Sequence, residues 1–159
     1  MTTAIFPGSF DPLHNGHVEI VERAHKLFDR VVVAVLRNPQ KSDPLFASEL
    51  REQLIRECFS HLRHVEVVTM QTLVVEVARS IGADVIIRGL RAVSDFENEL
   101  QMAQMNQQLS GIETLFIPTG STYSFISSRL IREVATFGGD VSLFVPEPIL
   151  REMKERFRD

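Results

Sequence analysis

The sequence predicts an α/β protein with one doubly wound, parallel sheet. Short apolar runs alternate with amphipathic segments of helical length, and no repeat or linker interrupts them. Strands that alternate with helices are joined by right-handed crossovers, which place helices on both faces of a parallel sheet. A chain of 159 residues is the size of one domain, so we expect residues 1–159 to form a single domain.

Apolar runs that predict the strands are Ala4–Phe6, Val31–Leu36, Val65–Thr69, Val85–Ile87 and Thr114–Ile117. We expect a Rossmann-like sheet with the strand order 3-2-1-4-5. In such sheets ligands bind beyond the carboxyl ends of the strands, where the strand order reverses. The loops after the first and fourth strands, Pro7–Gly16 and Arg88–Ser94, should therefore face each other across a crevice.

Patterns that predict helices lie near His17–Phe28, Glu49–His61, Leu73–Ile81 and Asp95–Leu109, with two more after Ser127 and Pro146. The first segment carries apolar residues at steps of three and four, which indicates one buried face. Ser94 and Glu97 form a capping-box pattern that predicts the start of the fourth helix. Gly82 and Gly111 stand where glycine commonly ends a helix.

Composition limits the classes of partner and compartment. The net charge of −4 argues against a broad nucleic-acid surface, although a small cationic pocket stays compatible with it. No apolar run approaches the length of about 20 residues that spans a bilayer, and the first residues lack a signal-peptide pattern. A lone cysteine, Cys58, is typical of a reducing compartment, so we expect a cytoplasmic protein. Leucines at helical spacing around Cys58 favour core packing over a reactive thiol.

The loop after the first strand has the pattern of a phosphate site. Gly8, Ser9, Gly16 and His17 all fall between a strand and a helix. A helix N-terminus attracts phosphate, Gly16 leaves room for close approach, and Ser9 and His17 can donate hydrogen bonds. The alternative makes His17 a capping or surface residue and His14 a solvated loop histidine.

The loop after the fourth strand adds basic side chains. Arg88 and Arg91 follow the strand, and guanidinium groups suit bidentate contacts with phosphate oxygens. The alternative is a solvated basic turn paired with Asp95 or Glu97. Because the loop should open into the crevice, phosphate binding is the favoured interpretation.

Two further segments indicate phosphate binding only in combination with these two loops. Ser127 and Ser128 precede a helical pattern, where they can cap the helix or hold the terminal phosphates of a nucleotide. Lys41 follows the second strand, which should lie beside the first, so it can reach the same crevice.

The sequence lacks the motifs of other nucleotide-binding sites and of zinc sites. The sequence has neither the G-x-G-x-x-G of dinucleotide-binding dehydrogenases nor the G-x-x-x-x-G-K-[ST] of a P-loop. Two histidine pairs could ligate zinc, His14 with His17 and His61 with His64. Neither pair has a third ligand at metal spacing, so we expect no structural zinc and name no metal-ligating residue.

These segments together resemble the H-x-G-H nucleotidyltransferases and, within them, the bacterial phosphopantetheine adenylyltransferases. The resemblance covers essentially the whole chain. It rests on the Pro-Gly-Ser-Phe-Asp-Pro opening, the His14–His17 motif, Ile87–Arg91 with Asp95–Glu97, Gln101–Asn106, the Tyr-Ser-Phe-Ile-Ser-Ser segment and Gly139–Val141. The Arg-Gly-Leu-Arg stretch narrows the choice to the pantetheine branch.

The resemblance implies the reaction of ATP with 4′-phosphopantetheine to give dephospho-coenzyme A and pyrophosphate, with Mg²⁺ as cofactor. It also implies a homo-oligomer, typically a hexamer, with coenzyme A as a feedback ligand. Residues carried over for phosphopantetheine are Ser9, Lys41, Val74 and Arg88. Those carried over for ATP are Ser9, Phe10, His17, Gly89, Leu90, Arg91, Glu99, Tyr123, Ser124, Phe125, Ile126, Ser127, Ser128 and Arg129.

Three features depart from the family pattern. Tyr123 stands where tryptophan is common, Arg129 replaces a small residue, and residues 42–43 lengthen the loop after Lys41. Alternatives to phosphopantetheine are nicotinamide mononucleotide as acceptor or a cytidylyl transfer to an alcohol phosphate. A non-catalytic nucleotide sensor and, behind it, an NAD-dependent oxidoreductase are further alternatives.

The chemistry needs positioning and charge stabilisation, because one phosphate must attack another. No motif resembles an activated Ser or Cys nucleophile. The catalytic roles expected are His17 at the α-phosphate, Lys41 and Arg88 at the attacking phosphate, and Arg91 with Ser127 and Ser128 at the leaving pyrophosphate.

The fourth helical pattern gives an independent indication of self-association. It carries two apolar stripes, Phe96, Leu100 and Ala103 on one and Met102, Met105 and Leu109 on the other. One stripe can pack on the sheet and leave the second for a partner, although both could also pack within one subunit.

Overall fold

The structure is a computed structural model that describes residues 1–38, 43–91 and 93–158, and of residues 93–95 only the backbone. Its elements in chain order are β1 (Thr3–Gly8), α1 (Asn15–Leu27), β2 (Arg30–Leu36), α2 (Ser48–Cys58), β3 (Val65–Met70), α3 (Val74–Ile81), β4 (Val85–Leu90), α4 (Val93–Ser110), β5 (Glu113–Pro118), α5 (Ser128–Thr136) and α6 (Glu147–Arg156). All the predicted strands and helices are present.

The strands form one parallel sheet in the order β3-β2-β1-β4-β5, which confirms the predicted order. β1 is central, and Ile5 pairs with Val32 on one side and with Ile86 on the other. These residues are β-branched and fully or almost fully buried, as expected of a parallel sheet covered on both faces. The strand order reverses between β1 and β4, so the crevice lies beyond their carboxyl ends.

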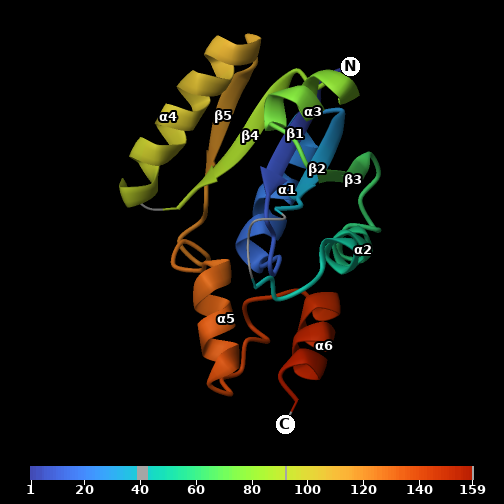
Figure 1. The fold of residues 1–159 in the computed structure, drawn as a ribbon, viewed down its shortest axis with the longest axis vertical. Coiled ribbons are helices and arrows are strands. Elements are labelled where there is room, and N and C mark those ends of the chain that lie inside the picture. The colour runs from blue at the N-terminus through green and yellow to red at the C-terminus, as the bar shows by residue number, and fades with distance from the viewer. Residues whose placement is uncertain (39–42, 92, 159) are drawn as a thin grey trace.

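Alternate residues of β1 contribute to two apolar cores. Ala4 and Phe6 face a large core that takes in residues of α1, α2, α5 and α6. Ile5 faces a smaller core with residues of α3. In Figure 1, α5 and α6 lie beyond the carboxyl ends of the strands, so the last part of the chain closes that end of the sheet.

The glycine-terminated ends of α3 and α4 agree with the sequence, whereas α2 ends at Cys58, before the expected His61. Gly82 and Gly111 have φ of 71° and 76° and directly follow α3 and α4, as predicted. The capping-box prediction for Ser94 is wrong, because α4 already begins at Val93 and Ser94 lies inside its first turn. Cys58 is half-buried against the larger core, as predicted.

Both apolar stripes of α4 keep exposed side chains in the single chain. Phe96 contacts Phe116 of β5, with ring centroids 6.4 Å apart. Met102 and Met105 are each 58% exposed. Within the described part of the chain, no helix combines the length and apolar character needed to cross a membrane.

Candidate active site

A cavity of about 370 Å³ opens at the carboxyl ends of β1 and β4. Predicted site residues that line it are Ser9, Phe10, His17, Arg88, Gly89, Arg91, Glu99, Ser127, Ser128 and Arg129. They come from the β1–α1 loop, the start of α1, the end of β4 with the residue after it, α4 and the start of α5. The two loops expected to face each other therefore do so, and α5 supplies a third wall.

Two histidines shape the start of α1. His14 is the N-cap residue, and its Nδ1 accepts a hydrogen bond of 3.0 Å from the backbone N–H of Gly16. The Nδ1 atom of His17 accepts in turn from the backbone N–H of His14, at 3.1 Å. A ring nitrogen that accepts carries no proton, so both neutral rings hold their proton on Nε2. Each ring is thereby left with Nε2–H as its remaining donor.

Both histidines are held in the neutral form. Burial, reinforced by the positive charge of Arg91, lowers the pKa of His14 to about 3. Burial also lowers the pKa of His17 well below its ordinary value, with further contributions from His14, Arg91 and Arg88. The interpretation of His14 as a solvated loop residue is wrong, because only 3% of it is exposed. The cavity thus contains neutral imidazole donors near fixed guanidinium charges.

Arg88 is oriented by a bidentate ion pair with Glu99 of α4. Its Nε and Nη2 donate to the two carboxylate oxygens at 2.9 and 2.8 Å, and Nη1 donates to the Pro7 carbonyl at 2.8 Å. Of the two alternative partners, Glu97 is not the residue that pairs with Arg88, and the side chain of Asp95 lies outside the described part of the structure. A guanidinium has five N–H groups, and these bonds use three, so two remain for an anion.

Arg91 connects two walls of the cavity. Its Nη1 donates to the carbonyl of Ile126 at 2.7 Å, so the end of β4 is tied to the segment before α5. Arg129, in the first turn of α5, is exposed and makes no hydrogen bond or ion pair with any residue that the structure describes.

Both serines at the start of α5 have structural contacts. Ser127 is the N-cap of α5, and its Oγ accepts from the backbone N–H of Leu130 at 3.1 Å. Ser128 donates its hydroxyl to the carbonyl of Pro12 at 2.8 Å. The capping alternative is therefore correct for Ser127. The helix N-terminus is still at the cavity wall, so α1 and α5 both direct partial positive charge toward it.

Some predicted residues do not line this cavity. Val74 begins α3 and packs beside the smaller core. Leu90 is the last residue of β4, and its carbonyl accepts a hydrogen bond from the backbone N–H of Thr119. Tyr123, Ser124 and Phe125 lie in the turns before α5, and Ile126 is buried. Lys41 lies outside the described residues.

Sequence reasoning missed several lining residues, among them Phe6, Ile20 and Thr119. Thr119 directly follows β5, which neighbours β4, so its place after a strand was a usable signal. Ile20 gave no such signal, because it appears only as part of the buried face of α1. A Cβ added to Gly89 would lie 3.3 Å from Ile20, which explains the glycine at this close approach.

The arrangement favours a bound polyphosphate. Three arginines line the cavity, Arg88, Arg91 and Arg129, and the N-termini of α1 and α5 lie at its wall. Glu99 is the one carboxylate among the described lining residues. Among the described residues the histidine rings are hydrogen-bonded to backbone groups and not to a hydroxyl or thiol, so the structure shows no histidine-activated Ser or Cys there. The residues can bind and orient phosphates and stabilise developing charge.

The chain matches the cytidylyltransferase-like family over residues 5–134. It is 56% identical over 155 residues to the phosphopantetheine adenylyltransferase of Gloeobacter violaceus, covering 97% of this chain and 96% of that protein. It is 49% identical over 160 residues to the phosphopantetheine adenylyltransferase of Heliobacterium modesticaldum, covering 100% of this chain and 95% of that one. Its fold is similar to that of the lipopolysaccharide core biosynthesis protein from Thermoplasma volcanium, with a TM-score of 0.56 and 25% identity over 76% of this chain and 97% of that one.

Proposed function

The chain belongs to the phosphopantetheine adenylyltransferases, and we propose that the cavity beyond β1 and β4 is where its reaction takes place. The protein transfers the adenylyl group of ATP to 4′-phosphopantetheine and releases pyrophosphate, a step of coenzyme A biosynthesis. The observation that carries the site assignment is the meeting of His17, Arg88 and Arg91 in one cavity at the point where the strand order reverses.

The proposed mechanism is a direct in-line displacement. An oxygen of the acceptor phosphate forms a bond to the α-phosphorus of ATP, and the bond from that phosphorus to the bridging oxygen breaks. Pyrophosphate leaves with the electron pair of the broken bond. The acceptor phosphate is already an anion near neutral pH, so no general base is needed, and mutual repulsion of the two phosphates is the main obstacle.

His17 is suited to the α-phosphate. Its Nδ1 is occupied by the backbone, so Nε2–H is the donor, and the ring is neutral. A preorganised donor that strengthens as charge develops stabilises the transition state more than the ground state. We therefore assign His17 to the α-phosphate oxygen in the transition state.

The guanidinium groups divide between the two ends of the reaction. Arg88, held by Glu99, has two free N–H groups for the attacking phosphate, with Lys41 as its proposed partner there. Arg91 and the first turn of α5 would hold the leaving pyrophosphate. Ser127 and Ser128 then contribute mainly through that helix terminus, because their hydroxyls already make structural contacts.

Mg²⁺ is the proposed cofactor, bound chiefly through ATP. Glu99 is the one carboxylate among the described residues of the cavity wall, and it is paired with Arg88. Mg²⁺ commonly binds substrate phosphates and keeps several waters, so a cage of protein ligands is not required. When bound, the ion would supply charge neutralisation on the phosphates, and Glu99 is the side chain that could approach it.

We also propose that the chain assembles into a homo-oligomer, a hexamer by resemblance, through the surface of α4 and β5. The exposed apolar residues there are Phe96, Leu100, Met102, Met105, Leu109 and Leu115. An apolar surface of this kind favours association. A cytoplasmic location and coenzyme A as a feedback ligand complete the proposal.

The acceptor is tested by pyrophosphate release. Purified protein with ATP and Mg²⁺ is assayed with 4′-phosphopantetheine, nicotinamide mononucleotide, an alcohol phosphate or no acceptor. We expect pyrophosphate release with 4′-phosphopantetheine and not with the other two acceptors or without an acceptor. Release with another acceptor and not with this one would reject the proposed substrate, and ATP binding without any release would favour a sensor.

A further inference from the structure

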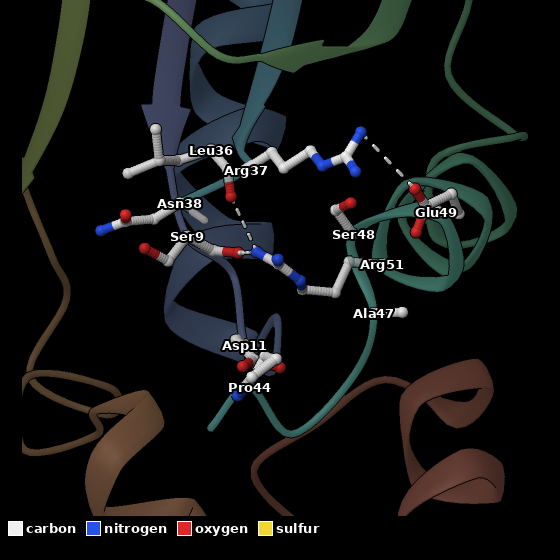
Figure 2. A pocket seen from close by; sticks show the side chains of 10 residues that line it. All are labelled: Ser9, Asp11, Leu36, Arg37, Asn38, Pro44, Ala47, Ser48, Glu49 and Arg51. Carbon is white, nitrogen blue, oxygen red and sulfur yellow. Dashed lines mark hydrogen bonds and ion pairs between the residues drawn. The ribbon is translucent and has the colours of Figure 1, made fainter. Parts of the chain in front are cut away.

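A buried arginine lies behind Ser9, on the side of the cavity that we assign to the acceptor phosphate and call the acceptor side. Arg51 of α2 is only 6% exposed. Figure 2 shows its guanidinium reaching the ends of β1 and β2, where Nη1 donates to the carbonyls of Ser9 at 2.6 Å and Leu36 at 3.0 Å. Its Nε donates to the carbonyl of Phe46 at 3.1 Å. One side chain thus bonds three separate segments of backbone.

A buried carboxylate completes this cluster. Asp11, 4% exposed, accepts from the backbone N–H groups of Leu45 at 2.7 Å and Phe46 at 3.0 Å. Arg132 of α5 lies 3.5 Å from the same carboxylate and donates to the carbonyl of Asp43 at 3.0 Å. Burying the positive charge of Arg51 costs free energy, and the negative charge of Asp11 offsets part of that cost.

The bonds of the cluster converge on two pieces of the acceptor side. One is the loop that starts at Ser9, which lines the main cavity and also a second cavity of about 290 Å³. The other is the connection from β2 to α2, held at Leu36 where it begins and at Asp43, Leu45 and Phe46 where it ends. Lys41 lies in sequence between these two held ends.

Apart from Ser9, which is expected to contact both substrates, the residues on the ATP side are held by different contacts. His17 is fixed by its own capping interaction with His14, and Arg91 by the carbonyl of Ile126. None of the bonds of Arg51 reaches these residues. A change at Arg51 should therefore disturb one substrate more than the other.

We propose that Arg51 is a positioning residue for the acceptor phosphate, which it serves by fixing Ser9 and both ends of the connection from β2 to α2. The inference rests on the adenylyl transfer proposed above. A lysine cannot replace it, because an ammonium is a point donor, whereas the planar guanidinium presents donors in several directions to separate carbonyls.

The test is Arg51→Lys in the full chain, with initial rates measured while each substrate is varied in turn. We expect the KM for 4′-phosphopantetheine to rise about tenfold, since small misplacement of binding groups is costly. The KM for ATP should stay within about twofold. Arg56→Lys is the matched control on the same helix, where Arg56 bonds Glu52 and the carbonyl of Val67, and both KM values should stay near those of the unsubstituted protein.

The outcomes separate the two proposals. Equal rises in both KM values, or unchanged KM values, would overturn the role of Arg51 while leaving the reaction intact. An unsubstituted protein that is inactive with 4′-phosphopantetheine would remove the proposed site function and the role of Arg51 with it. If Arg51→Lys does not fold, Arg132→Lys must show the same selective rise in the KM for 4′-phosphopantetheine, about threefold, or the proposal fails.

Discussion

The rings of His14 and His17 stack with their centroids 3.6 Å apart and their planes 24° from parallel. Each ring accepts a backbone N–H through Nδ1, from Gly16 and from His14 itself. The H-x-G-H motif is therefore a reciprocal helix cap built from two imidazoles. The same contacts that start α1 also fix the tautomer that leaves Nε2–H as the donor of each ring.

Replacing His17 should lower turnover strongly. His17→Ala removes one preorganised donor, so kcat should fall by about 10²- to 10³-fold, or about 3 kcal/mol of transition-state stabilisation. The measurement is steady-state pyrophosphate release. His17→Asn, which keeps a donor on a shorter side chain, should recover part of the loss, and near-normal turnover of His17→Ala would reject the assigned role.

Acidification should destabilise the fold through His14. Its folded-state pKa is about 3, against an ordinary 6.5, so between these values the unfolded chain binds a proton that the folded chain does not. The free energy of unfolding should therefore fall as the pH drops from 6.5 toward 3, with no contribution from this group above 6.5. Calorimetric Tm values at pH 5 and 7.5 check this.

In that comparison His14→Gln should show a smaller loss of Tm between pH 7.5 and pH 5 than the unsubstituted protein. Glutamine can still accept from Gly16 but does not titrate. His61→Gln is the control, because His61 is an exposed histidine outside the buried pair. Parallel curves for all three proteins would contradict the neutral buried state of His14.

Arg129 should strengthen binding of the nucleotide phosphates. It is an exposed cation at the N-terminal turn of α5, where a bound anion would offset its repulsion by the helix dipole. Arg129→Ser should raise the KM for ATP about three- to fivefold, less at high salt, as is typical of exposed charges. Arg158→Ser, at the far end of the chain, should have no effect, and an unchanged KM for Arg129→Ser would rule out a phosphate contact.

The surface of α4 should mediate assembly. Met105→Glu places a charge on a residue that is 58% exposed in the single chain, so an interface there should dissociate while the subunit stays folded. Light scattering after size exclusion would give the masses, with Leu27→Glu as a control on an exposed apolar residue of α1. A large species that Met105→Glu leaves intact would move the interface elsewhere.

Cys58 should be unreactive in the folded protein. Burial, with a smaller contribution from Glu57, raises the pKa of its thiol to about 12, so the reactive thiolate is scarce at pH 8. A disulfide reagent should modify it far more slowly in native protein than in guanidinium chloride. Comparable rates in both conditions would show that the thiol is accessible and its packing loose.

The fold was predictable because its signal is local. The strands of this sheet are continuous apolar runs such as Val31–Leu36, and the helices between them carry apolar residues at helical spacing, so both element types stand out. The two loops that line the cavity were predictable from their position after strands β1 and β4. Neither inference needs knowledge of how distant side chains meet.

Ion pairs between distant segments were less predictable. The alternative interpretation paired the arginines with Asp95 or Glu97, whereas Arg88 pairs with Glu99. Which carboxylate of a helix faces a strand depends on where the helix begins. The apparent capping box at Ser94 led to a predicted helix start after Val93, where α4 begins. The contacts of Arg51 with Ser9 and Leu36 gave no sequence signal at all, because they depend on how α2 packs against the sheet.

The central claim is that the cavity holds both substrates for direct transfer, with no covalent enzyme intermediate. It is tested most directly by the stereochemistry at the α-phosphorus of ATP, using a single diastereomer of ATP with sulfur at that phosphorus and 4′-phosphopantetheine as acceptor. One in-line displacement predicts inversion of configuration. Retention would mean two displacements through an adenylylated residue and would contradict the account.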